Sequence, residues 1–117
     1  MILIYSLHPL NKREMDNQRN LLKERLSPFF ITDDDFLYST ESNPQLLKEV
    51  IHHHKVYLFI TKSIAMMGFS PKVLSDLITY MLKNKCCFRS EIDNLSIGEE
   101  GMDDVEPMVS EILKKTT

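Results

Sequence analysis

The chain has 117 residues, 43% of them hydrophobic and 26% charged, with a formal net charge of −3 and a pI near 5.8. This length suits one domain with one core, and the composition is that of an ordinary globular protein. A weakly acidic chain lacks the basic patch with which DNA-binding domains neutralise phosphates, so we do not expect it to bind DNA by itself.

The sequence gives no sign of membrane insertion or export, and we expect a cytoplasmic protein. Its longest apolar run is far shorter than the roughly 20 residues that cross a bilayer. The first residues lack the pattern of a signal peptide. Cys86 and Cys87 are adjacent and should point to opposite faces of a strand. They favour buried thiols in a reducing compartment over a disulfide.

An apolar run and a capping signal mark the first strand and helix. Residues 2–5 are continuously apolar, which predicts a buried strand. Asn11 can cap the helix that begins near Lys12, with Glu14 three residues later as its capping-box partner. The helix is expected to end before Ser27-Pro28, because the residue before a proline disfavours helical backbone.

A second, short strand is predicted at residues 29–32, after which Asp33, Asp34 and Asp35 open a polar loop. The next helix begins at Asn43-Pro44, where a capping residue precedes proline at the first helical position. It ends at His52-His53-His54, whose rings suit the negative end of the helix dipole. Because three consecutive imidazoles diverge around a helix, we interpret them as a solvated terminus and not as a zinc site.

Two more strands and one helix follow. Residues 56–60 are the most continuous apolar run, typical of a buried parallel strand, and residues 86–90 predict the fourth strand. Between them, Ser70-Pro71 repeats the cap-plus-proline signal before an amphipathic helix. The alternation of strands and helices predicts an α/β fold, a mainly parallel four-stranded sheet with helices on both faces in flavodoxin-like layers.

We expect a single domain with a core at residues 1–95, an acidic link at 96–102 and a last helix at 103–115. The apolar face of that helix includes Val109, Ile112 and Leu113.

The spacing of several residues resembles the catalytic domain of the serine recombinases, the resolvase/invertase family. Tyr5 and the Gln18-Arg19 pair match the family's first strand and helix with no gap between them. Asn43-Pro44-x-Leu46 stands where the family has Arg-Pro-Gly-Leu, and residues 60–82 follow its strand, Asp-Arg-Leu-Gly-Arg-Ser loop and helix. The resemblance covers residues 2–95 and implies a resolvase-like fold with an ancestry in DNA recombination.

The groups that carry the family's chemistry are replaced in this chain. In the family a serine attacks a DNA phosphate while arginines stabilise the developing charge. The serine position is Pro9, and the arginine two residues before it is Leu7. The arginine before the second helix is Asn43, and the later loop reads Ala65-Met66-Met67-Gly68-Phe69, without its carboxylate and arginines. Gln18 and Arg19 are retained.

The resemblance therefore predicts a domain without recombinase activity, which needs no cofactor and acts as a protein-interaction or regulatory module. In the family the corresponding last helix leads to a DNA-reading domain, which we do not expect after Thr117. A protein partner or self-association is expected, and the sequence identifies no small-molecule ligand. The candidate contact residues are apolar: Met66, Met67, Val109, Ile112 and Leu113.

The alternative is a different enzyme on the same scaffold, acting on a nucleotide or phosphate. It would use His8 and Lys62, together with Asp33 to Asp35, which we expect to follow a strand at the same edge of the sheet. His8 and the three aspartates are also the weak candidates for a metal site. This alternative requires a concave, polar pocket between the first and third strand ends, and it fails if Pro9, Leu7 and Met66 fill that edge.

Two other functions are ranked lower. A rebuilt Ser-His-Asp site from His8 with Ser6, Ser63 or Ser90 lacks a Gly-x-Ser-x-Gly elbow. A receiver domain would need an aspartate where Thr61-Lys62 stands.

Overall fold

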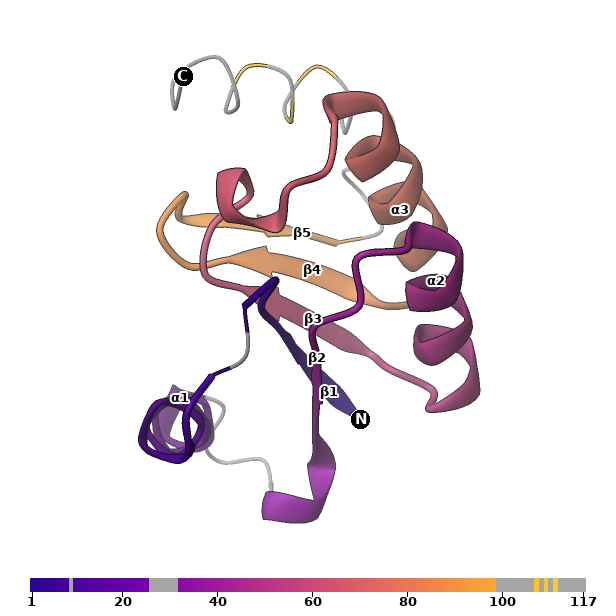
Figure 1. Ribbon diagram of the computed structural model, residues 1–117. Helices are drawn as coiled ribbons and strands as arrows, with labels where there is room; N and C mark the ends of the chain where they lie inside the picture. Colours follow the sequence, from indigo (N-terminus) through magenta and orange to yellow (C-terminus); the bar gives the residue numbers. More distant parts are fainter. Residues whose placement is uncertain (9, 26–31, 99–106, 108, 110, 112–117) are drawn as a thin grey trace.

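The chain folds around a mixed β-sheet (Figure 1). The computed structural model describes residues 1–8, 10–25, 32–98, 107, 109 and 111. In these residues the sheet has five strands, in the order β2-β1-β3-β4-β5. Their bounds are β1 Ile2–Tyr5, β2 Phe36–Ser39, β3 Leu58–Thr61, β4 Cys87–Ser90 and β5 Leu95–Ile97. The first four strands are parallel and β5 runs antiparallel to β4. The mainly parallel α/β sheet is confirmed, and the predicted number of four strands is wrong.

Three helices in the described ranges cover the two faces of the sheet: α1 Lys12–Arg25, α2 Pro44–His53 and α3 Pro71–Lys83. Figure 1 shows α1 on one face, with α2 and α3 side by side on the other. The predicted helix starts are confirmed, because each cap accepts backbone N–H groups of the first turn. The capping oxygens are Asn11 Oδ1, Asn43 Oδ1 and Ser70 Oγ. None of these helices is long and apolar enough to cross a membrane.

The second strand lies further along the chain than predicted. Thr32 is not in a strand, and residues 29–31 lie outside the described residues. Strand β2 instead occupies Phe36–Ser39, within the segment that the sequence predicts to be a polar loop. It pairs with β1 so that Phe36 stands opposite Ile2, and Phe36 packs with Leu22 of α1. The three aspartates form a 3₁₀ turn, and the apolar segment that follows them pairs with β1 and buries Phe36.

The fifth strand falls in the segment predicted to begin the acidic link. Ser96 and Ile97 belong to β5, which forms a hairpin with β4 through a turn at residues 91–94. Ile97 is buried in the core, which explains why this short segment pairs with β4. Residues 107, 109 and 111 are helical, in agreement with the predicted last helix at those three positions.

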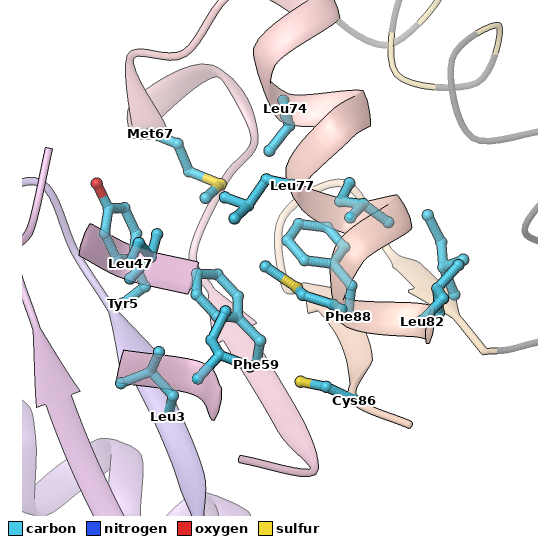
Figure 2. Close-up of a cluster of buried hydrophobic side chains, with 14 of the residues drawn as sticks. Leu3, Tyr5, Leu47, Phe59, Met67, Leu74, Leu77, Leu82, Cys86 and Phe88 are labelled. Carbon is cyan, nitrogen blue, oxygen red and sulfur yellow. The ribbon is translucent and has the colours of Figure 1, made fainter. Parts of the chain in front are cut away.

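The core lies mainly between the sheet and the α2–α3 layer (Figure 2). Three aromatic rings form its centre: Tyr5 and Phe59 stack at 5.5 Å between centroids, and Phe59 and Phe88 at 5.8 Å. Leu77 of α3 is fully buried against this cluster. A smaller cluster on the opposite face joins β1 to Leu22 of α1. Alternate residues of the strands thus feed two separate apolar layers.

The two adjacent cysteines differ in environment. Cys86 is buried, and burial raises the pKa of its thiol from 9.0 to about 12. Cys87 is exposed, so the prediction that both thiols are buried is wrong for this residue. Both thiols are free, and Cys86 lies just before β4, which begins at Cys87.

We predict that Leu77→Ala lowers the free energy of unfolding by about 2–5 kcal/mol, because it leaves a cavity in a closely packed core. Urea denaturation followed by circular dichroism measures the change. Leu46→Ala on α2 is the matched control, since the Leu46 side chain is 44% exposed and its loss should cost less than about 1 kcal/mol. Equal losses in the two variants would contradict this description of the core.

Candidate functional site

A pocket of about 550 Å³ opens at the carboxyl ends of β1 and β3. It lies between α1 and the segments that follow β1, β3 and β4. After β1 the chain forms β2 on one side of it, and then crosses to the other side, where β3, β4 and β5 are added in turn. Such a switch point at the carboxyl ends of parallel strands is where α/β folds most often bind ligands.

Among the described residues, seven apolar side chains line the pocket, together with polar and charged ones, and come from α1, the sheet and the loops. They are Leu7, Leu10, Leu21, Leu22, Ile60, Met66 and Ile92. Three of them are half exposed or more: Leu21 by 50%, Met66 by 53% and Ile92 by 63%. Large apolar side chains that gather around one concavity are typical of a binding site.

The loops after β1 and β3 are closely packed, and Gly68 makes this possible. Its φ is +78°, a left-handed conformation that favours glycine, and a Cβ there would lie 3.2 Å from Leu7 Cδ2. Tyr5 reinforces the contact, because its ring stacks on Phe69 at 6.2 Å and its hydroxyl donates to the Glu41 carbonyl at 2.9 Å. Burial, and then the Glu41 carboxylate, raise the pKa of Tyr5.

The opposite wall is held by Asp93 in the turn between β4 and β5. One oxygen of its carboxylate, Oδ2, accepts a hydrogen bond from the Ile64 N–H at 2.8 Å and another from the Ser90 hydroxyl at 2.5 Å. The N–H of Ile92 donates to the Lys62 carbonyl at 2.8 Å. These bonds tie the turn to the segment after β3, which fixes Ile92 beside the pocket.

Charged groups surround the pocket. Arg25 of α1 donates to Glu91 at 2.7 Å, which joins the helix to the β4–β5 turn, and the two charges compensate each other. Lys62 is exposed and has no ion-pair partner in the described part of the chain. His8 and Glu14 are also exposed lining residues. The pocket therefore combines apolar side chains with two charges for which no ion pair is seen in the described residues, the Lys62 ammonium and the Glu14 carboxylate.

Gln18 lies in the wall with an unsatisfied polar atom. Its Oε1 is buried, and no described group donates a hydrogen bond to it. A buried acceptor without a partner costs about 1–3 kcal/mol. Because the atom is closed to a water-sized probe, it lies beneath the pocket surface and does not face a ligand.

The positions named by the recombinase resemblance are partly brought together. Leu7, Met66 and Gln18 line the pocket. Ala65 is exposed in the short 3₁₀ turn before Gly68, and Phe69 is half-buried against Tyr5. Two positions serve local structure: Asn43 caps α2, and Arg19 forms an ion pair with Asp16 on its own helix. Pro9 lies outside the described residues.

The five candidate contact residues lie in different environments. Met66 is exposed at the pocket, whereas Met67 and Val109 are buried in the core. Ile112 and Leu113 lie outside the described residues. Met67 and Val109 therefore stabilise the domain itself in this conformation.

The aspartates of the alternative enzyme are not in the pocket. Asp33–Asp35 form a 3₁₀ turn before β2, at the amino edge of the sheet, so their predicted place at the carboxyl edge is wrong. The reason is the shifted position of β2. Asp35 accepts from the Thr32 N–H at 2.8 Å and so closes a local turn. Within the described residues no three His, Cys, Asp or Glu side chains are grouped to hold a metal ion.

None of the three candidate serines is hydrogen-bonded to the imidazole of His8 in the described residues. Ser6 donates to the His8 backbone carbonyl at 2.6 Å, Ser90 donates to Asp93, and Ser63 is buried. No serine among the described residues is hydrogen-bonded to an imidazole, so they form no Ser-His-Asp relay.

Sequence reasoning missed two side chains that shape the site. Leu21 lies next to the buried Leu22 but off the apolar stripe of α1, and Ile92 lies in a polar turn between Glu91 and Asp93. For Ile92, a large apolar residue between two acidic ones was the available signal, although it does not indicate where the side chain lies in the fold.

No protein-family model, curated protein or solved structure matches this chain. Fold and site together define an α/β domain with an open, mainly apolar pocket at the carboxyl edge of its sheet.

We predict that Asp93→Ala lowers the free energy of unfolding by about 1–3 kcal/mol, because the Ile64 N–H and Ser90 hydroxyl lose their acceptor. Amide hydrogen exchange at Ile64 should accelerate more than at the helix centres. Asp76→Ala, on the exposed side of α3, is the control and should change stability by less than about 0.5 kcal/mol. Unchanged exchange at Ile64 would show that Asp93 does not hold this wall.

Gln18→Met is expected to raise the free energy of unfolding by about 1 kcal/mol, because it removes the unsatisfied acceptor at nearly constant volume. Thermal and urea unfolding measure the gain. Asn17→Met, a neighbouring exposed position on α1, controls for the apolar substitution itself. A loss of stability in Gln18→Met would mean that the amide makes a favourable contact in solution.

Proposed function

We propose that this chain is a serine recombinase-like domain that has lost DNA cleavage and acts as a cytoplasmic regulatory module, with the carboxyl-edge pocket as its binding site. The observation that carries the proposal is the placement of Leu7 and Met66. Both occupy positions where the resemblance implies charged active-site loops, and both line the pocket. An apolar wall there favours binding an apolar group over stabilising a phosphate.

The arrangement of the strands supports the proposed ancestry. Strands β1 and β3 are direct neighbours, with Tyr5 opposite Thr61. The two loops that carry the family's chemistry therefore start side by side at one edge. Gln18 reaches the same pocket from α1, as its retained position in the resemblance requires.

The available side chains argue against phosphoryl transfer to DNA. Ser6 is the serine in the pocket wall, and its hydroxyl donates to the His8 backbone carbonyl and not to an imidazole or carboxylate that could activate it. Arg25, the lining guanidinium, is paired with Glu91. The described pocket residues thus include hydroxyl groups, Ser6 and the buried Thr61, but their arginine is paired and is not free to clamp a phosphate.

The phosphate-processing alternative keeps some support. His8 and Lys62 do line a concave pocket between the ends of β1 and β3, as that alternative requires. However, the aspartates that would hold a magnesium ion are at the other edge of the sheet, and the wall is mainly apolar. We therefore place this function second.

The proposal predicts that the protein leaves supercoiled plasmid DNA intact and forms no covalent protein–DNA adduct. Agarose electrophoresis after detergent and protease treatment measures nicking, and denaturing gels with labelled DNA detect an adduct. Ser6→Ala is assayed in parallel, because Ser6 is the serine in the pocket wall. An adduct formed by the unaltered protein would refute the proposal, and its loss in Ser6→Ala would identify the nucleophile.

A further inference from the structure

We infer that the pocket binds a small aliphatic carboxylate, with its carboxylate at Lys62 and its hydrocarbon chain against Leu21, Met66 and Ile92. The inference deepens the proposed function, because it names the ligand class of the regulatory site and rests on that site being a binding site. It follows from the size, wall and charge of the pocket.

Size and position favour a small molecule. The volume of about 550 Å³ falls within the range of small-ligand sites, roughly 300–1,000 Å³. The pocket also lies at the β1–β3 switch point, where flavodoxin-like sheets place their ligands.

The wall favours an aliphatic ligand body. Leu21 projects from α1, Met66 from the 3₁₀ turn after β3, and Ile92 from the β4–β5 turn. All three are half exposed or more, so a hydrocarbon chain between them would remove apolar surface from water on several sides. The thioether of Met66 adapts readily to a flexible chain.

The charges favour a single anionic head group. Arg25 and Glu91 compensate each other, whereas Lys62 has no ion-pair partner among the described residues. Glu14, in the first turn of α1, is a second charge at the pocket without an ion pair in the described residues, so Lys62 is the cation that remains for an anionic head group.

A carboxylate fits this pocket better than a phosphate does. Phosphate sites at the end of a strand usually use glycine-rich backbone whose N–H groups converge on the anion. None of the described lining residues is glycine, and the neighbouring Gly68 is occupied in packing against Leu7. One lysine at the edge of an apolar wall suits a singly charged head.

Methyl NMR can test the inference with octanoate as the probe, kept below its micelle-forming concentration. The Cε methyl of Met66 should shift in a saturable manner, whereas that of Met67, which is 1% exposed in the core, should change little. Lys62→Met should weaken octanoate binding about fivefold, the effect of losing one exposed ion pair, and should change binding of uncharged octan-1-ol less than about twofold. Lys72→Met, on the exposed surface of α3, is the matched control.

The apolar half of the site is tested separately. Ile92→Ser should weaken the binding of both octanoate and octan-1-ol, because it removes apolar surface from the pocket without changing its charge. Leu46→Ser removes an exposed leucine outside the pocket and should leave both affinities unchanged. Both side chains are at least 44% exposed, so neither substitution is expected to prevent folding.

Each negative outcome has a distinct meaning. No saturable Met66 shift with octanoate, or equal weakening by Lys62→Met and Lys72→Met, would overturn the carboxylate assignment. Met66 shifts that depend on protein concentration without octanoate would also overturn it, since a second copy would then occupy the pocket. A covalent DNA adduct in the plasmid assay would instead overturn the proposed function, and that assay is independent of octanoate.

Discussion

The pairing of β1 with β3 is the constraint on which the rest of the molecule depends. Tyr5 stands opposite Thr61, so the two strands end together and their following loops begin at the same edge. Because β1 is also bonded to β2 and buried on both faces, its position cannot shift without disturbing both apolar layers. The pocket is the space that remains where these two loops turn away towards α1 and the 3₁₀ turn Ala65–Met67.

The elements that the sequence predicted correctly are those specified by local interactions. Asn11, Asn43 and Ser70 cap helices because their side-chain oxygens reach N–H groups only two or three residues away. Strand β2 was missed because its partners are distant in sequence, and β5 because it is only three residues long, although its partner β4 lies just across a turn. Phe36 is stabilised by Ile2 and Leu22, and Ile97 by its pairing with Phe88. Neither contact leaves a periodic signal in a segment of three or four residues.

The candidate site was predictable only in part, for the same reason. The resemblance directed attention to the segments around Leu7 and Met66, and both residues line the pocket. The Asp33–Asp35 placement failed because one misplaced strand moves the loop before it to the opposite edge of the sheet. The sequence could not predict Ile92 as a pocket residue, because only the hydrogen bonds of the β4–β5 turn bring it beside the segment after β3.

The chemistry of the edge follows from which charges remain uncompensated there. A phosphate-binding centre needs several donors in a dry cleft, because removing a dianion from water is costly unless many groups replace its hydration. Within the part of the chain that the structure describes, this pocket has an unpaired lysine, an unpaired glutamate, a compensated Arg25–Glu91 pair and several apolar side chains. Such a surface favours the burial of a hydrocarbon group over stabilising the charge that develops on a transferred phosphate. Under the proposed function, loss of cleavage and gain of an apolar binding site would both follow from the same two positions, Leu7 and Met66, which line the pocket.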